Sequence, residues 1–207
     1  PISKVLHPRS VELAMAWNVP LQVLSSFDPS IGSDLPGTQV VREEDIVEKQ
    51  IVNGVTYARN EAKVTLMSVP DKPGIAAAIF APLGKAGVNV DMIIQNISPD
   101  GQSTDMTFTI PREDTPLVES LIKNLPDIDG GEIRMDSNVS KISVVGIGMN
   151  SHSGVATTMF STLAERGINI RAITTSEIKI SVLIAEEYTE LAVRALHTAF
   201  ALDKDAA

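Results

Sequence analysis

The chain has 207 residues, of which 43% are hydrophobic and 21% charged, so it has room for one large globular domain or two small ones. It contains no cysteine, which excludes disulfides and thiolate metal sites, and its net charge of -9 disfavours a nucleic-acid partner and favours small-molecule or protein partners. The apolar runs are too short to span a membrane and none resembles a signal peptide, so we expect a cytoplasmic protein.

The chain opens with a predicted short helix and a short strand. Ser10 can cap a helix over residues 11–17, and residues 21–24 follow as a strand. Residues 28–37 are rich in Pro, Gly, Ser and Asp, which indicates a loop or linker. Because one helix and one strand cannot form a stable domain, residues 1–40 are interpreted as the remnant of a larger domain plus a linker.

An internal repeat organises the rest of the chain. Residues 63–97 read as a strand, a tight turn, an amphipathic helix, a glycine stop and a second strand. Residues 141–173 show the same pattern, with a two-residue insertion in the turn. A repeat of this size indicates two related structural modules. The matching positions are Lys63 and Lys141, Gly74 and Gly154, Gly87 and Gly167, and Asn89 and Asn169.

The first repeat, residues 62–137, is predicted to have the order strand, helix, strand, strand, helix, strand. Its first helix begins after Pro73 and should kink or end early at Pro82, with Gly87 as its C-terminal cap. The other predicted elements are strands at 88–97, 104–110 and 133–135, a hairpin turn at 99–102, and a helix at 115–123. This order is that of the ferredoxin-like fold, an antiparallel sheet with helices on one face.

The second repeat, residues 138–207, ends before a fourth strand can be assigned. Its predicted elements are 141–147, 154–165, 169–174, 178–185 and 187–200. Residues 51–58 form a weakly alternating strand whose Asn-Gly pair suits a turn or a bulge, and they can supply the missing strand. That pairing would insert the first repeat inside the second. The expected fold class is therefore α+β, with two ferredoxin-like βαββαβ domains in tandem.

Motifs for catalysis are absent or weak in the sequence. No Ser occupies a strand-to-helix elbow and no phosphate-binding loop occurs. Gly146 and Gly148 precede a helix but lack the third glycine of a dinucleotide site. His152 lies between two serines, which is more typical of a turn histidine than of a catalytic triad. We therefore predict no catalytic residue and no metal ligands in this chain.

The turn before the first helix of the first repeat is the best candidate for binding a ligand. The free N–H groups and the dipole of a helix N-terminus favour a carboxylate, and Asp71 can accept a hydrogen bond from an α-ammonium group. An amino acid carries both charges, and this turn can recognise both. The alternative is that Asp71 only caps the helix. The turn at 150–153 has no acidic counterpart, so the two repeats are expected to have unequal roles.

Polar residues on the strand after this helix extend the candidate site. Asn89, Asp91 and Gln95 are predicted to share one face of the strand, with Met92 and Ile94 on the other. A polar strand face usually meets solvent, but beside the turn these side chains suit a polar ligand at a sheet edge. The corresponding polar residues of the second repeat are Asn169, Ser176 and Glu177.

Several runs of the sequence resemble a known family. VPDKPGIAAAIF, GVNVDMIIQN and STDMTFTIP resemble the first regulatory ACT domain of bacterial aspartate kinases, and SKISVVGIGMNSHSGVA with INIRAITTSEIKISVLI resembles the second. KVLHPRSVELAMAWNVPLQVLSSF is similar to the C-terminal end of the kinase domain, so the resemblance covers nearly the whole chain. It implies a regulatory part, or a separately made β subunit, that binds threonine, lysine or both. Either amino acid would act as a feedback inhibitor of the phosphorylation of aspartate by ATP, the first step toward lysine, threonine and methionine.

The resemblance also implies site residues and partners. A threonine-type site would use Asp71, Gly74, Ile75, Ala76, Gln95, Asn169 and Ile170. Lysine-type contacts would fall on Asn89, Asp91, Ser176 and Glu177. ATP and Mg²⁺ would be used by a kinase domain or catalytic α subunit, the expected partner, so we expect no cofactor and no kinase activity in this chain alone. ACT modules of this family pair side by side across chains, so a homodimer is expected.

Two other functions remain open at this stage. The chain can be part of a catalytically active aspartate kinase if a phosphate loop precedes Pro1. It can also be an ACT sensor of another enzyme of amino-acid metabolism, although the kinase-like residues 4–27 argue against that interpretation.

Overall fold

The computed structural model describes residues 6–24, 26–27, 37–40, 51–98, 101–126, 132–146 and 153–203. They belong to two compact units, Pro1–Ile51 and Val52–Ala207. Residues 28–36 of the predicted linker and residues 147–152 of the second-repeat turn, with Gly148 and His152, lie outside the described residues. No helix within the described part of the chain is long and apolar enough to cross a membrane.

The first unit contains one helix and a two-stranded sheet. Helix α1 (Pro8–Ala16) begins earlier than predicted, and its N-cap is His7 rather than Ser10. The reason is that Pro8 suits the first helical position, while the His7 Nδ1 atom accepts a hydrogen bond from the N–H of Arg9 at 3.3 Å. Strand β1 (Leu21–Val23) lies where a strand was predicted and pairs antiparallel with β2 (Thr38–Val40).

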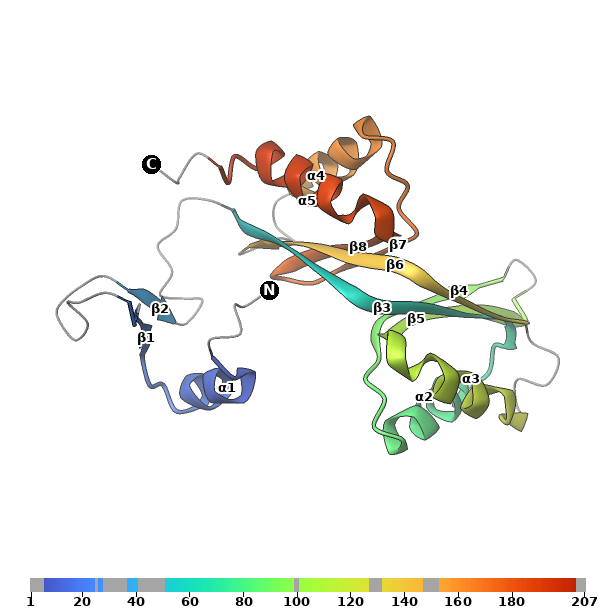
Figure 1. The fold of residues 1–207 in the computed structure, drawn as a ribbon. Coiled ribbons are helices and arrows are strands. Elements are labelled where there is room, and N and C mark those ends of the chain that lie inside the picture. The colour runs from blue at the N-terminus through green and yellow to red at the C-terminus, as the bar shows by residue number, and fades with distance from the viewer. Residues whose placement is uncertain are drawn as a thin grey trace. The chain divides into compact units, whose positions relative to one another are not determined.

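The second unit is built on one six-stranded antiparallel sheet with the strand order β4-β5-β3-β6-β8-β7 (Figure 1). Its strands are β3 (Val52–Pro70), β4 (Asp91–Ile97), β5 (Ser103–Pro111), β6 (Glu132–Gly146), β7 (Ala172–Thr175) and β8 (Lys179–Ala185). Strands β4 and β7 are the two edges of this order, and residues of these two strands contact each other. The sheet is therefore strongly curled rather than flat.

The long strands β3 and β6 each belong to both repeats. The second half of β3 pairs with β5 and with the first half of β6, which completes the first ferredoxin-like sheet. The first half of β3 pairs with the second half of β6, from Val52 opposite Gly146 to Ala58 opposite Lys141. Residues 52–58 thus supply the fourth strand of the second repeat, as the sequence suggested. The register shifts between Val52 and Gly54, so the Asn-Gly pair forms a bulge and not a turn.

Each repeat has its own pair of helices and its own hydrophobic core. Helices α2 (Ile75–Lys85) and α3 (Thr115–Lys123) cover the first repeat, and α4 (Ser153–Glu165) and α5 (Thr189–Ala199) cover the second (Figure 1). The 3-10 turns η2 (Arg112–Asp114) and η5 (Glu186–Tyr188) lead into α3 and α5. The two buried clusters share no residue. Largest among the fully buried side chains of these clusters are Phe108, Leu66, Ile79 and Leu83 in the first and Ile142, Met159, Leu163 and Ile184 in the second.

Two details of the first repeat differ from the prediction. Helix α2 does not end at Pro82 but continues to Lys85, because the buried Leu83 anchors its last turn and accepts a hydrogen bond from the N–H of Val88 at 3.0 Å. Gly87, with φ of 77°, then closes the helix in the left-handed region as predicted. The strand after it begins at Asp91 instead of residue 88.

Candidate functional site

The turn before α2 is fixed by backbone hydrogen bonds. The N–H of Asp71 donates to the carbonyl of Gln102 at 2.9 Å, which ties the turn to the β4–β5 hairpin. The N–H of Ile75 donates to the carbonyl of Lys72 at 3.2 Å, and Gly74 adopts a left-handed φ of 91° that favours glycine. Asp71 itself is exposed to solvent. These contacts position the N-terminus of α2 beside the end of strand β4.

Asp71 does not cap the helix. The N-cap of α2 is Gly74, and no side chain donates or accepts a cap hydrogen bond there. The interpretation of Asp71 as a capping residue is therefore wrong for this structure. Instead, its carboxylate is left beside a helix N-terminus without a side-chain cap, and such a terminus attracts negatively charged groups. The turn thus combines an acceptor for an ammonium group with backbone donors for a carboxylate.

The two residues that follow Gly74 have different surroundings. The side chain of Ile75 is buried in the first core cluster, and its N–H is already used in the turn. The Ile75 side chain therefore anchors the turn in the core and is not available to contact a ligand. Ala76 is exposed in the first turn of the helix, where its small side chain leaves the backbone accessible.

A bulge in β4 separates residues that the sequence placed on one face. Asp91 pairs with Thr109, whereas Gln95 pairs with Met106, and the register shifts by one residue between Asp91 and Ile94. Met106 belongs to the core under the helices, so Gln95 lies on the helix side of the sheet and Asp91 on the opposite side. The shared face predicted for Asn89, Asp91 and Gln95 is therefore wrong. Met92, with a positive φ of 42°, is the residue that breaks the alternation.

Asp91 is bound by the chain's own Lys141. The Nζ atom of Lys141 lies 2.7 Å from the Asp91 carboxylate and 2.5 Å from that of Glu61, while the other Asp91 oxygen accepts the N–H of Met92 at 2.9 Å. Burial opposes the charge of Asp91, but the hydrogen bonds from Lys141 and Met92 outweigh it and lower the pKa of Asp91. Burial likewise opposes the charge of Lys141, and the hydrogen bonds to Asp91 and Glu61 raise its pKa.

The second repeat places its predicted residues at the other edge of the sheet. Asn169 is exposed just before β7, and Ile170 is half-buried against the second core. Ser176 is held in the β7–β8 hairpin, where its N–H donates to the carbonyl of Lys179 at 2.8 Å, and Glu177 beside it is exposed. The structure therefore brings together the Asp71 turn and the helix side of β4. It leaves the second-repeat residues beside the other edge strand, β7.

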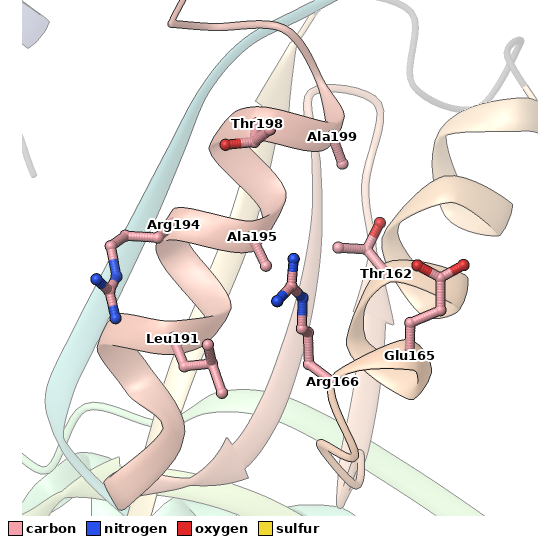
Figure 2. Close-up of a pocket in the computed structure, with 8 residues that line it drawn as sticks. All are labelled: Thr162, Glu165, Arg166, Leu191, Arg194, Ala195, Thr198 and Ala199. Carbon is pink, nitrogen blue, oxygen red and sulfur yellow. The ribbon is translucent and has the colours of Figure 1, made fainter.

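A hollow of about 470 Å³ lies between α4 and α5, away from all of these residues (Figure 2). Its walls include Thr162, Leu191 and Ala195, and the side chain of Arg166 extends between the two helices while Arg194 points away from them (Figure 2). None of the predicted site residues lines it. Among the described residues there is also no group of three or more His, Asp or Glu side chains that could hold a metal ion.

Sequence reasoning missed the partners of Asp91. Lys141 and Glu61 lie on different long strands, 80 positions apart, and no local pattern connects them. The available signal was the charge itself, because Lys141 is the only Asp, Glu, Lys or Arg in residues 137–151 of the sequence and has a repeat counterpart in Lys63. A charged residue inside a buried strand requires a partner of opposite charge.

Comparisons with known proteins agree with this architecture. Family models described as ACT domain match residues 63–127 and 142–200. The aspartokinase of Pseudomonas aeruginosa is 49% identical over 99% of this chain and 49% of its own length, so the chain spans about half the length of this curated relative. A crystal structure of aspartokinase alpha and beta subunits matches at 48% identity, covering 72% of this chain and 99% of that one, with a TM-score of 0.67. The regulatory subunit of aspartate kinase from Thermus thermophilus matches at 38% identity, covering 73% and 99%, with a TM-score of 0.68.

The matches and the fold lead to one assignment. The two family models fall on the two repeats defined by the sheet. The first repeat has the βαββαβ order, and the second has the order βαββα with its fourth strand supplied by residues 52–58. The chain covers nearly all of the two matched subunit structures. The chain therefore belongs to the aspartate kinase family and contains two tandem ACT domains.

Proposed function

We propose that this chain senses an amino-acid end product, threonine, lysine or both, and regulates an attached or associated aspartate kinase. The observation that carries the proposal is the α2 N-terminus with no side-chain cap, beside the exposed Asp71. An α-amino acid has the two charges that these groups recognise in one place. The whole enzyme would convert ATP and aspartate to 4-phosphoaspartate in its kinase part, where ATP and Mg²⁺ bind.

The first ACT domain is the favoured site, and a ligand of the threonine type fits it best. Asp71, Gly74 and Ala76 lie around the turn, and Gln95 lies on the same side of the sheet. Gln95 is exposed on an edge strand, where its amide can reach a polar side chain of a ligand. Asn169 and Ile170 would complete the site from a second ACT domain, because they lie beside the other edge strand.

A ligand of the lysine type would have to compete with an internal ion pair. Its side-chain ammonium would have to bind Asp91, whose carboxylate already contacts Lys141. Asn89 is exposed and available, and Ser176 and Glu177 lie in the hairpin of the second repeat. Binding of lysine through Asp91 therefore includes the cost of sharing or displacing an internal cation. This cost favours threonine over lysine at the first ACT domain.

We further propose that the chain forms a homodimer through its edge strands. Strand β4 has one unpaired edge, and Ile93 and Ile97 on it are 55% and 66% exposed. Ile173 on the opposite edge strand is 43% exposed. Unpaired backbone and exposed apolar side chains on one strand are the features that promote pairing with another chain. An effector bound at such a seam changes kinase activity only by favouring one relative orientation of the domains.

Titration calorimetry with threonine and with lysine tests the proposal. We expect threonine to bind the wild-type chain and its heat to be strongly reduced in Asp71→Ala and in Gln95→Ala. Glu177→Ala serves as the matched control for threonine, because it also removes an exposed polar side chain but belongs only to the lysine-type contacts. A folded chain that binds neither amino acid would contradict the proposal. Analytical ultracentrifugation of the same samples tests the dimer, and a monomer mass at every concentration would exclude it.

A further inference from the structure

The two ACT domains are joined by a narrow crossover. Strands β3 and β6 are the two that continue from one repeat into the other, and they pair along their length. Their register shifts twice within a short distance, between Ala58 and Glu61 and again between Glu61 and Lys63. Bulges interrupt the ladder and increase local twist, so this is where the ribbon can change its angle most easily. The two hydrophobic cores lie on either side and share no residue.

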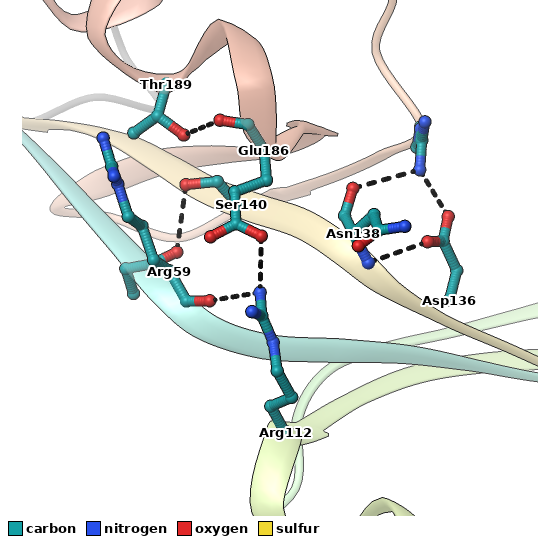
Figure 3. Close-up of polar contacts among 9 residues, drawn as sticks. Arg59, Arg112, Asp136, Asn138, Ser140, Glu186 and Thr189 are labelled. Atoms are coloured by element: carbon teal, nitrogen blue, oxygen red, sulfur yellow. Dashed lines mark hydrogen bonds and ion pairs between the residues drawn. The ribbon is translucent and has the colours of Figure 1, made fainter.

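Charged side chains bridge the repeats around this crossover (Figure 3). The Nη2 atom of Arg112 in the first repeat lies 2.9 Å from a carboxylate oxygen of Glu186 in the second, and it also donates to the carbonyl of Arg59 at 2.7 Å. Arg171 of the second repeat pairs with Asp136 of the first. The pair of Lys141 with Asp91 is a third bridge, described above. All three connect residues of different repeats.

The bridging positions are equivalent in the repeat but opposite in charge. Asp91 and Arg171 each lie four residues after the helix-ending glycine of their repeat. Arg112 and Glu186 each begin the 3-10 turn, and the carbonyl of each accepts a hydrogen bond from a threonine hydroxyl three residues later. Arg112 and Glu186 face each other, whereas Asp91 and Arg171 both face strand β6. The opposite charges at equivalent positions therefore make the two repeats complementary.

The surroundings of Lys63 also show complementary charges between the repeats. It is the repeat counterpart of Lys141, so a symmetric contact would place Arg171 against Lys63, where two positive charges would repel. Instead Arg171 bonds to Asp136, which is the residue directly opposite Lys63 on the neighbouring strand. The repeats have thus diverged at the residues that meet between them.

We propose that this crossover is a latched hinge, in which the bulges of the β3–β6 ribbon permit the two ACT domains to rotate and the three charge pairs hold one orientation. Two of the pairs are better shielded from solvent at both partners than an ordinary surface pair, and the third is shielded at Lys141, which is 15% exposed, although Asp91 is 51% exposed. The side chains of Arg171 and Asp136 are each 32% exposed, whereas those of Lys123 and Glu119 on α3 are 62% and 46% exposed. Shielded pairs resist screening by salt and fix geometry more strongly. The inference does not depend on which effector binds.

Spin-label distance measurements test the latch directly. The chain has no cysteine, so Ser120→Cys on α3 and Ser161→Cys on α4 place one label on each repeat at exposed positions. Labelled chain diluted with an excess of unlabelled chain reports only distances within one molecule. We expect a single narrow distance in the otherwise unchanged protein and an additional, shifted population in Arg112→Glu, which places two carboxylates together.

Restoration and control variants make the test specific. The swapped variant Arg112→Glu with Glu186→Arg recreates the ion pair and should remove most of the shifted population. Lys141→Met with Glu61→Gln opens the latch at a second point without leaving a buried carboxylate unpaired, so it decides the question if Arg112→Glu does not fold. Lys123→Met breaks only the surface pair and should leave the distance unchanged. An unshifted distance in both latch variants would overturn the proposal.

Discussion

The two ACT domains are alike where they fold and different where they meet. At the end of the first helix of each repeat, a glycine takes a positive φ, 77° at Gly87 and 68° at Gly167. In both, the residue after the glycine donates to a buried leucine, Val88 to Leu83 at 3.0 Å and Ile168 to Leu163 at 2.9 Å. The equivalence holds to the level of single hydrogen bonds.

The facing positions changed while this scaffold stayed constant. Where the first repeat has Asp91 and Arg112, the second has Arg171 and Glu186. Residues that close a helix satisfy a local geometric need that is the same in both copies. Residues between the copies satisfy each other, so their charges have to differ. A duplicated domain therefore keeps its internal contacts and becomes asymmetric at its internal interface.

The largest effect is expected from equivalent core leucines. Leu83→Ala and Leu163→Ala each remove a fully buried side chain, and each should cost about 2–5 kcal/mol of unfolding free energy. Chemical denaturation followed by circular dichroism measures this. If the latch makes the repeats one cooperative body, both variants lower the midpoint of the same transition. A separate early transition in only one variant would show that the two repeats unfold independently. Leu117→Ala, at a position that is 43% exposed, is the control and should cost less.

A smaller, matched effect is expected at the helix-ending glycines. Gly87→Ala and Gly167→Ala add a Cβ that meets no atom within 4 Å, so their cost comes from the left-handed backbone alone, about 1–2 kcal/mol each. The two losses should agree, because the geometry agrees.

Gly84 provides a control at which the same substitution should raise the free energy of unfolding instead of lowering it. It lies inside α2 with equally open surroundings and no positive φ. Gly84→Ala should therefore stabilise the protein by up to about 1 kcal/mol, because alanine favours the helix. Thermal or chemical unfolding of the three variants side by side measures these differences. Unequal losses at Gly87 and Gly167 would break the structural equivalence of the repeats.

Local patterns predicted much of this fold from the sequence. Helix α3 was predicted at its observed limits, 115–123, because its apolar spacing and flanking residues are local signals. The assignment of residues 52–58 to the second repeat followed from counting strands in a known topology. The length of β3 was not predictable, because its side-chain alternation is broken by bulges. Helix α2 was predicted to kink or end early at Pro82. The early end is wrong, because burial of Leu83 in the last turn outweighs the one hydrogen bond that Pro82 cannot make.

The candidate site was predictable only in part. The Asp71 turn was found because a helix N-terminus has a local sequence signature. The faces of β4 were assigned wrongly, because a single bulge at Met92 reverses all later positions and no residue type marks it. The contact of Asp91 with Lys141 joins residues 50 positions apart, and such a pairing depends on the whole topology.

The smallest expected effect is a pH dependence that distinguishes the crossover from the surface. The pKa of Asp91 lies below its ordinary value of 3.8 in the folded protein. Its contribution to stability is therefore present above pH 3.8 and lost as the pH falls through the lowered value. Asp91→Asn removes this contribution, so the variant should be less stable than wild type at neutral pH, and the difference should shrink in acid.

Glu132 supplies the comparison for this titration. Its pKa is also lowered, by a hydrogen bond from Arg134, but both side chains are well exposed. Added salt should therefore weaken the effect of Glu132→Gln more than that of Asp91→Asn, because solvent ions reach the surface pair more easily. Denaturation midpoints at neutral and acidic pH, in low and high salt, measure both variants. Equal salt sensitivity would mean that Asp91 and Lys141 behave as a surface pair. The two repeats would then be held together by the ion pairs of Arg112 and Arg171 alone.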